Sequence, residues 1–211
     1  MSAARRIANP RATLPRSARG RVLTTATGAL AAALMVGGCT SGGVSGGSDK
    51  SGYVTNSGGV SVVKKADRKP GPKLDGTTLD GKKLDVASYR GKVVVLNTWG
   101  SWCPPCREEA RGFAKVAEAT ADQGVQFVGI NTRDHDKGPA QQFEKSYKVP
   151  YPSLYDPAGR LMLRFPKGTL NPQSIPSTVV LDRDGDLAAR SLAPLSEEKL
   201  RKMLDPLIAE K

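Results

Sequence analysis

Two cysteines separated by two prolines, Cys103-Pro104-Pro105-Cys106, constrain what this chain can fold into more than any other feature of its sequence. An apolar run precedes this motif and a helical pattern follows it, so the motif is predicted to connect a strand to a helix. Proline is accepted in the first turn of a helix, because the amides there have no partner within the helix. The remaining amides and the helix dipole then point at the sulfur atoms and stabilise a thiolate, which is the reactive form of cysteine.

The spacing of the two cysteines indicates redox exchange. A disulfide between them encloses almost no chain, whereas the stabilisation that a disulfide gives to a fold grows with the enclosed loop. The third cysteine of the sequence, Cys39, lies far upstream. A domain whose two cysteines share one C-x-x-C motif does not use them as a structural framework. Half of a zinc site is the alternative, but zinc takes four ligands and this region adds only His135, which we interpret as a loop residue.

The beginning of the chain predicts export. Residues 1–21 hold six arginines and no acidic residue, and an apolar stretch over 22–36 follows that is short and rich in alanine for a membrane span. Small residues then precede Cys39. A basic start, an apolar centre and small residues before a cleavage point are typical of a secretory signal peptide, which we predict over residues 1–38.

Residues 34–39, LMVGGC in one-letter code, resemble the lipobox of bacterial lipoproteins. In that class the cysteine is lipidated and becomes the first residue of the mature chain. The resemblance implies a lipid on Cys39 that holds the protein at the extracytoplasmic face of the cell membrane. A plain signal peptide with a chance cysteine, or an uncleaved anchor, is the alternative. We expect residues 39–72, rich in glycine and serine up to residue 59, to form a flexible tether.

The basic composition does not predict a nucleic-acid partner. The formal net charge is +12, but six of the 32 basic residues lie in the predicted signal peptide, which leaves a net charge of +6. No basic stripe interleaved with aromatic residues is visible in the remainder. Two basic pairs near the tether, Lys64-Lys65 and Arg68-Lys69, are interpreted as a solvated linker face, with attraction to an anionic membrane as the alternative.

Residues 73–211 alternate strand and helix patterns, which predicts a single α/β domain. Two Asp-Gly turns indicate a hairpin over 74–84. Continuous apolar runs indicate strands that are covered on both faces. The strands are expected over 92–99, 125–130, 177–182 and 186–190, and the helices over 103–122, 139–147 and 195–209, the last capped by Ser196. This order resembles the thioredoxin-like fold, a central mixed sheet flanked by helices, here with an N-terminal β-hairpin extension.

Residues 97–109, NTWGSWCPPCREE, resemble the active-site segment of the TlpA/ResA family of membrane-attached, extracytoplasmic thiol–disulfide oxidoreductases. The region 76–91 and residues 174–185, SIPSTVVLDRDG, match the same family, so the resemblance covers roughly residues 70–210. Members often carry a proline soon after the acidic pair, which is Glu108-Glu109 in this chain. This chain has Gly112 near that place, which would permit a similar bend.

The resemblance implies a reductant that receives electrons from a membrane-embedded thiol donor and reduces protein disulfides such as those of apocytochrome c. No cofactor is expected besides the Cys103–Cys106 disulfide. We predict Cys103 as the nucleophile, because it is the N-terminal and more exposed thiol, and Cys106 as the resolving thiol.

Glu109 is the third candidate catalytic residue. Helical spacing places it with Cys106 and Phe113 on the apolar side of the helix, whereas Glu108 faces water. A carboxyl group in that place should have a raised pKa and could exchange protons with the resolving thiol, and the family resemblance points to the same position. A carboxylate at the rim that merely favours the start of the helix is the alternative.

Pro176 is the fourth candidate, and it depends on the resemblance. In thioredoxin-like proteins the matching Ile-Pro bond is cis and packs against the dithiol, and the backbone of the residue before it, here Ile175, binds the substrate peptide. We expect Trp102, Pro104 and Pro105 to form the rest of the substrate-binding rim, and Trp99 to face the core.

Three other functions remain open at this stage. The same chemistry run in reverse would make a disulfide-forming oxidant. A peroxide reductase of the same superfamily usually has a lone cysteine in a Thr-x-x-Cys setting, which this chain lacks. A copper-binding chaperone on this fold typically uses C-x-x-x-C with a distant histidine, whereas the spacing here is shorter.

Overall fold

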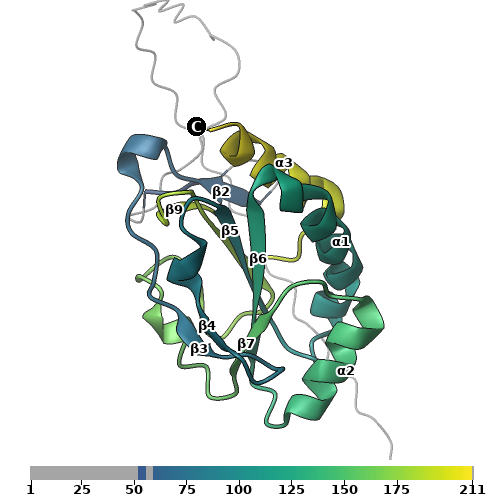
Figure 1. Cartoon of the computed structure of the whole chain (residues 1–211). Coiled ribbons are helices and arrows are strands. Elements are labelled where there is room, and N and C mark those ends of the chain that lie inside the picture. Colours follow the sequence, from purple (N-terminus) through teal and green to yellow (C-terminus); the bar gives the residue numbers. More distant parts are fainter. Residues whose placement is uncertain (1–51, 56–58, 211) are drawn as a thin grey trace, which may run out of the picture. The chain divides into compact units, whose positions relative to one another are not determined.

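The computed structural model describes residues 52–55 and 59–210 (Figure 1). Seven strands form a mixed sheet in the order β1-β2-β9-β8-β5-β6-β7, and β3 pairs with β4 in a separate hairpin. The strands are β1 (Val54–Thr55), β2 (Val60–Val62), β3 (Asp75–Thr77), β4 (Lys83–Asp85), β5 (Val93–Trp99), β6 (Val125–Thr132), β7 (Ser153–Asp156), β8 (Ser177–Leu181) and β9 (Leu187–Ser191). The α-helices are α1 (Pro104–Thr120), α2 (Lys137–Tyr147) and α3 (Glu197–Ala209), and four 3-10 turns are η1 (Lys65–Asp67), η2 (Val86–Tyr89), η3 (Ala121–Gln123) and η4 (Met162–Arg164).

The central strand β5 is buried along its whole length, as its apolar run predicts. It pairs in parallel with β6 and antiparallel with β8. Its side chains alternate between the two faces of the sheet. Val93 and Val95 belong to one core cluster, and Val94 and Leu96 belong to another on the opposite face.

All three α-helices lie on the same side of the sheet (Figure 1). Right-handed crossovers from β5 to β6 and from β6 to β7 place α1 and α2 on that face. The helix α1 contacts both α2 and α3. The opposite face is covered by η2, η4 and the segments beside them, through residues such as Leu74, Val86 and Met162. No helix within the described ranges has both the length and the apolar character needed to cross a bilayer.

The active-site helix α1 begins at the two prolines and runs without interruption through Gly112. A Cβ atom at Gly112 would lie 3.4 Å from Cβ of Glu197, so the glycine lets α1 approach the start of α3 closely. The helix α3 is capped as predicted, because the Ser196 hydroxyl accepts a hydrogen bond from the amide of Lys199.

The folded domain starts earlier than residue 73, and this corrects the tether predicted over 39–72. The strand β2 pairs with β9, and β1 pairs with β2, so these residues extend the sheet at its edge. The side chain of Arg68 is buried rather than part of a solvated linker face. Residues 39–51 and 56–58 of the expected tether lie outside the described residues, as do the predicted signal peptide over 1–38 and the predicted lipidation site Cys39.

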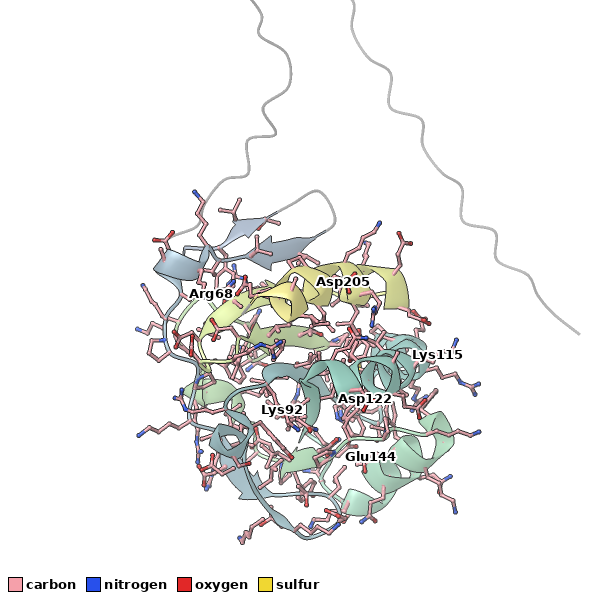
Figure 2. The ribbon with its side chains drawn as sticks, turned by 45° about the horizontal axis from the view of Figure 1, so that its top comes forward. Arg68, Lys92, Lys115, Asp122, Glu144 and Asp205 are labelled. Atoms are coloured by element: carbon pink, nitrogen blue, oxygen red, sulfur yellow. A yellow bond between two sulfur atoms is a disulfide. The ribbon has the colours of Figure 1, made fainter. Side chains whose placement is uncertain are left out.

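Arg68, labelled in Figure 2, joins this N-terminal segment to the end of the chain. Its guanidinium group donates to the Asp182 carboxylate at 3.0 Å and to both carboxylate oxygens of Glu210 at 2.6 and 2.7 Å. The side chains of Arg68 and Asp182 are only 5% and 9% exposed. A buried ion pair matters most when one partner is removed, because the other is then left uncompensated.

Replacing Arg68 with methionine should therefore lower the free energy of unfolding by about 2–4 kcal/mol. Urea denaturation measures this, with an unchanged m-value as the sign that the native fold persists. The matched control is Arg164→Met, because Arg164 pairs with Asp75 at the surface and exposed pairs contribute about 1 kcal/mol or less. Equal losses in the two variants would contradict the prediction.

Candidate active site

The dithiol lies at the carboxyl end of β5, where the chain turns into α1. Cys103 and Cys106 form a disulfide with an S–S length of 2.05 Å and a Cα–Cα distance of 5.3 Å. Cys103 is the N-cap of α1, and its Sγ accepts a hydrogen bond from the Cys106 amide at 3.3 Å. Pro104 and Pro105 occupy the first turn of the helix, as the sequence predicts.

Both cysteines are almost completely buried in the disulfide form, so the expected greater exposure of Cys103 is very small here. Cys103 is 2% exposed and Cys106 is 1% exposed. They pack in a hydrophobic cluster that also contains Leu79, Trp99 and Phe143. Any difference in reactivity between the two cysteines therefore depends on their place at the helix start, since Cys103 is the cap and Cys106 lies within the first turn.

Glu109 lies on the buried side of α1, three residues after Cys106, and is 6% exposed. Its carboxylate accepts hydrogen bonds from the Asn97 side-chain amide at 2.9 Å and from the Leu195 backbone amide at 3.0 Å. These bonds favour the charged form, but burial outweighs them and raises the pKa of Glu109 to about 7. Glu108 is exposed. The helical spacing thus predicts the burial of Glu109 correctly, and its catalytic role stays a prediction.

The peptide bond between Ile175 and Pro176 is cis, as the family resemblance implies. This segment leads directly into β8, which pairs with β5 beside the dithiol. The Thr98 hydroxyl donates to the Ser177 carbonyl at 3.1 Å and accepts from the Ser177 amide at 3.0 Å. Ile175 also packs against the cluster that contains both cysteines. The structure therefore holds the segment in place next to the disulfide.

The two tryptophans of the motif have different surroundings. Trp99 is buried and stacks on Phe143 with ring centroids 4.3 Å apart, as expected for a core residue. Trp102 is 45% exposed and stands immediately before Cys103. Pro104 is exposed and Pro105 is half-buried, so these three residues form an accessible surface at the dithiol.

The loop that follows β6 also belongs to the site, although no sequence pattern assigned it a role there. Asp134 is buried, and its carboxylate accepts hydrogen bonds from the backbone amide and hydroxyl of Ser101 at 2.8 and 2.5 Å, and from Asn131 at 2.6 Å. It thereby fixes the loop that leads into the disulfide. His135 is exposed in the same loop. The available signal was the position of Asp134 just after a buried strand, because the carboxyl ends of parallel strands carry the functional loops.

Comparison with known proteins agrees with this geometry. Residues 64–205 match the Redoxin family. The chain is 26% identical over 139 residues to a thiol-disulfide oxidoreductase ResA of Bacillus cereus, covering 66% of this chain and 77% of the relative. It is 36% identical over 140 residues to thiol:disulfide interchange protein DsbE of Yersinia pestis, covering 65% and 69%.

Two solved structures share the fold. A DsbF homologue from Corynebacterium diphtheriae is 35% identical with a TM-score of 0.66, covering 71% of this chain and 93% of its own. A secreted thiol-disulfide isomerase from Corynebacterium glutamicum is 31% identical with a TM-score of 0.65, covering 72% and 93%. The central mixed sheet with its flanking helices is thus thioredoxin-like, and the chain belongs to the Redoxin family as a thiol–disulfide oxidoreductase of the ResA/DsbE type, with Cys103 and Cys106 as its C-x-x-C pair.

Proposed function

We propose that this protein reduces protein disulfides on the extracytoplasmic side of a membrane, to which a lipid on Cys39 attaches it. The observation that carries the direction is the buried Glu109 on the same face of α1 as Cys106. The reduction potential of a dithiol depends on how strongly the protein stabilises its reduced, thiolate form. A carboxylate in a dry site beside Cys106 disfavours a second negative charge, which makes the dithiol a better electron donor.

The reaction transfers two electrons in two exchange steps. The Cys103 thiolate attacks one sulfur of the substrate disulfide, so that a mixed disulfide forms and the first substrate thiolate leaves. The Cys106 thiol then loses its proton and attacks Sγ of Cys103, and the second substrate thiolate leaves. The substrate is reduced and Cys103–Cys106 is oxidised to the disulfide. Glu109 holds or accepts the proton of Cys106, because its pKa lies near neutrality.

The oxidised enzyme needs a dithiol to reduce it again. We infer a membrane-embedded thiol donor, which attacks the Cys103–Cys106 disulfide and becomes a disulfide in turn. Support for the location comes from the N-terminal sequence with its lipobox-like residues 34–39 and from the similar Corynebacterium glutamicum protein, which is described as secreted. The cysteines of apocytochrome c are the substrate class that the family resemblance suggests.

The reduction potential of the Cys103–Cys106 pair tests the direction. Equilibration of the purified protein with defined thiol buffers should give a value near that of thioredoxin, about −270 mV, or below it. Trapping of the thiols at each buffer ratio, followed by mass spectrometry, measures the reduced fraction. A value toward about −120 mV would contradict the proposal, because it would mark an oxidant or an isomerase that introduces or rearranges disulfides.

A further inference from the structure

A second charged group lies close to the disulfide. The guanidinium carbon of Arg133, just after β6, is 4.9 Å from the ring centroid of Trp102, just after β5. The strands β5 and β6 are parallel neighbours with Trp99 opposite Asn131, so both segments leave the sheet at the same edge. Arg133 therefore lies over the exposed aromatic ring that directly precedes Cys103.

No carboxylate of the described chain forms an ion pair with Arg133. Its Nε is buried and has no hydrogen-bond partner among the described residues. The adjacent carboxylate of Asp134 is already engaged by Ser101 and Asn131. Buried polar atoms are normally satisfied, so the unpaired Nε indicates that the described chain does not supply every partner of this guanidinium group.

The backbone at Arg133 is held in an unfavourable conformation. Its φ angle is 60°, in the left-handed region that residues with a Cβ atom rarely adopt. The hydrogen bonds of Asp134 to Ser101 fix the next residue and so maintain this conformation. Strained residues that the surroundings hold in place are concentrated at functional sites. The same carboxylate thus positions both the loop before the disulfide and the arginine beside it.

We propose that Arg133 and Trp102 form a carboxylate-binding subsite beside the Cys103–Cys106 disulfide, for an acidic side chain that flanks the cysteine of the substrate. A guanidinium group stacked on an indole ring keeps its two terminal NH₂ groups free to donate, and these, unlike Nε, are not buried. Its planar fork matches the two oxygens of a carboxylate. This inference rests on the proposed function, because it names a feature of the protein substrate that the dithiol reduces.

Two disulfide peptides that differ only in a glutamate or a glutamine next to one cysteine provide the test. The reduced full-length protein should act on the glutamate peptide with a kcat/KM about tenfold higher than on the glutamine peptide, because charge-assisted hydrogen bonds are strong. In Arg133→Gln this ratio should fall to about one. Arg133→Lys should keep part of it, since the charge remains and the fork is lost. The ratio compares two peptides on one variant, so changes in thiol reactivity or folded fraction cancel.

Lys137 supplies the matched control. It is a second cation near this loop, at the first residue of α2, where it lies 5.2 Å from the ring centroid of Tyr155 and donates to the Thr78 carbonyl. Lys137→Met should therefore keep the tenfold preference. If the wild-type protein reduced both peptides with equal kcat/KM, the subsite would be overturned. The proposed function would then stand, because both disulfides would still be reduced. An equal loss in Arg133→Gln and Lys137→Met would also overturn it, as a general effect of charge. Failure to reduce either peptide would overturn the proposed function and the subsite with it.

Discussion

Replacing Cys106 with serine is expected to lower disulfide reduction by about a thousandfold or more and to leave the protein covalently linked to its substrate. Cys103 can still attack, because it is the N-cap of α1 and receives the favourable field of the helix start. The mixed disulfide then persists, because no second thiol within the site can release the product. Non-reducing electrophoresis and mass spectrometry of protein incubated with a disulfide substrate measure the trapped adduct.

The control for this experiment is Cys103→Ser, which should be equally inactive and should trap little adduct. Both cysteines are buried in the oxidised form, so the difference between the variants tests position in the helix rather than exposure. If Cys103→Ser accumulated the adduct and Cys106→Ser did not, the assignment of nucleophile and resolving thiol would be reversed.

Replacing Glu109 with glutamine is expected to lower kcat/KM by about a hundredfold at neutral pH and to remove an inflection near pH 7 from its pH profile. The wild-type carboxyl group changes protonation there, because burial raises its pKa to about 7. Glutamine keeps the size of the side chain but can neither take nor give the proton. The measurement is the pH dependence of peptide-disulfide reduction, with Glu108→Gln as the exposed neighbour on the same helix that should retain the inflection.

The same substitution has a consequence for stability whose sign is fixed by the pKa. Between the ordinary value of 4.5 and about 7, the folded state binds the proton of Glu109 more tightly than the unfolded state does. Stability contributed by this group is therefore present below pH 4.5 and is lost as the pH rises to about 7, by about 3 kcal/mol in all. Glu109→Gln should flatten this slope in urea denaturation at a series of pH values. Parallel curves for the two proteins would show that the carboxyl group titrates normally.

Much of the fold could be predicted because its main elements have local patterns. The run over β5 is apolar throughout and therefore indicated burial on both faces, and the stripe on α1 indicated its core side. The strand β7 was missed, because its few residues are held by pairing with β6 and lack an apolar run of their own. The contribution of β2 was missed for a similar reason, since its partner β9 lies far along the chain.

The residues of the site likewise fall into those that a local pattern predicts and those that only tertiary contacts bring together. The cysteines, the prolines and Glu109 lie on one turn-and-helix segment, so their spacing placed them correctly. Asp134 and Arg133 belong to the site only because the loop after β6 meets the loop after β5, which no local pattern shows. The burial of Cys103 escaped prediction because it depends on side chains such as Leu79 and Phe143 that come from other elements.

The pairing of β1 has a consequence for where the chain joins the sheet relative to the disulfide. Following the register of the paired strands from β1 through β2, β9 and β8 to β5 places Val54 beside Val95, which lies four residues before the end of β5. The strand β1 runs parallel to β5, because each of the four pairings is antiparallel. The chain thus enters the sheet about 13 Å from the edge that carries the disulfide, and β1 runs toward that edge. Tyr53 fixes this approach, because it is buried against the Arg190 guanidinium. The point at which β1 joins the sheet and the disulfide are therefore separated along the strand direction, so the two can be altered independently. Shortening the segment before Tyr53 should therefore leave the attack of Cys103 on soluble substrates unaffected.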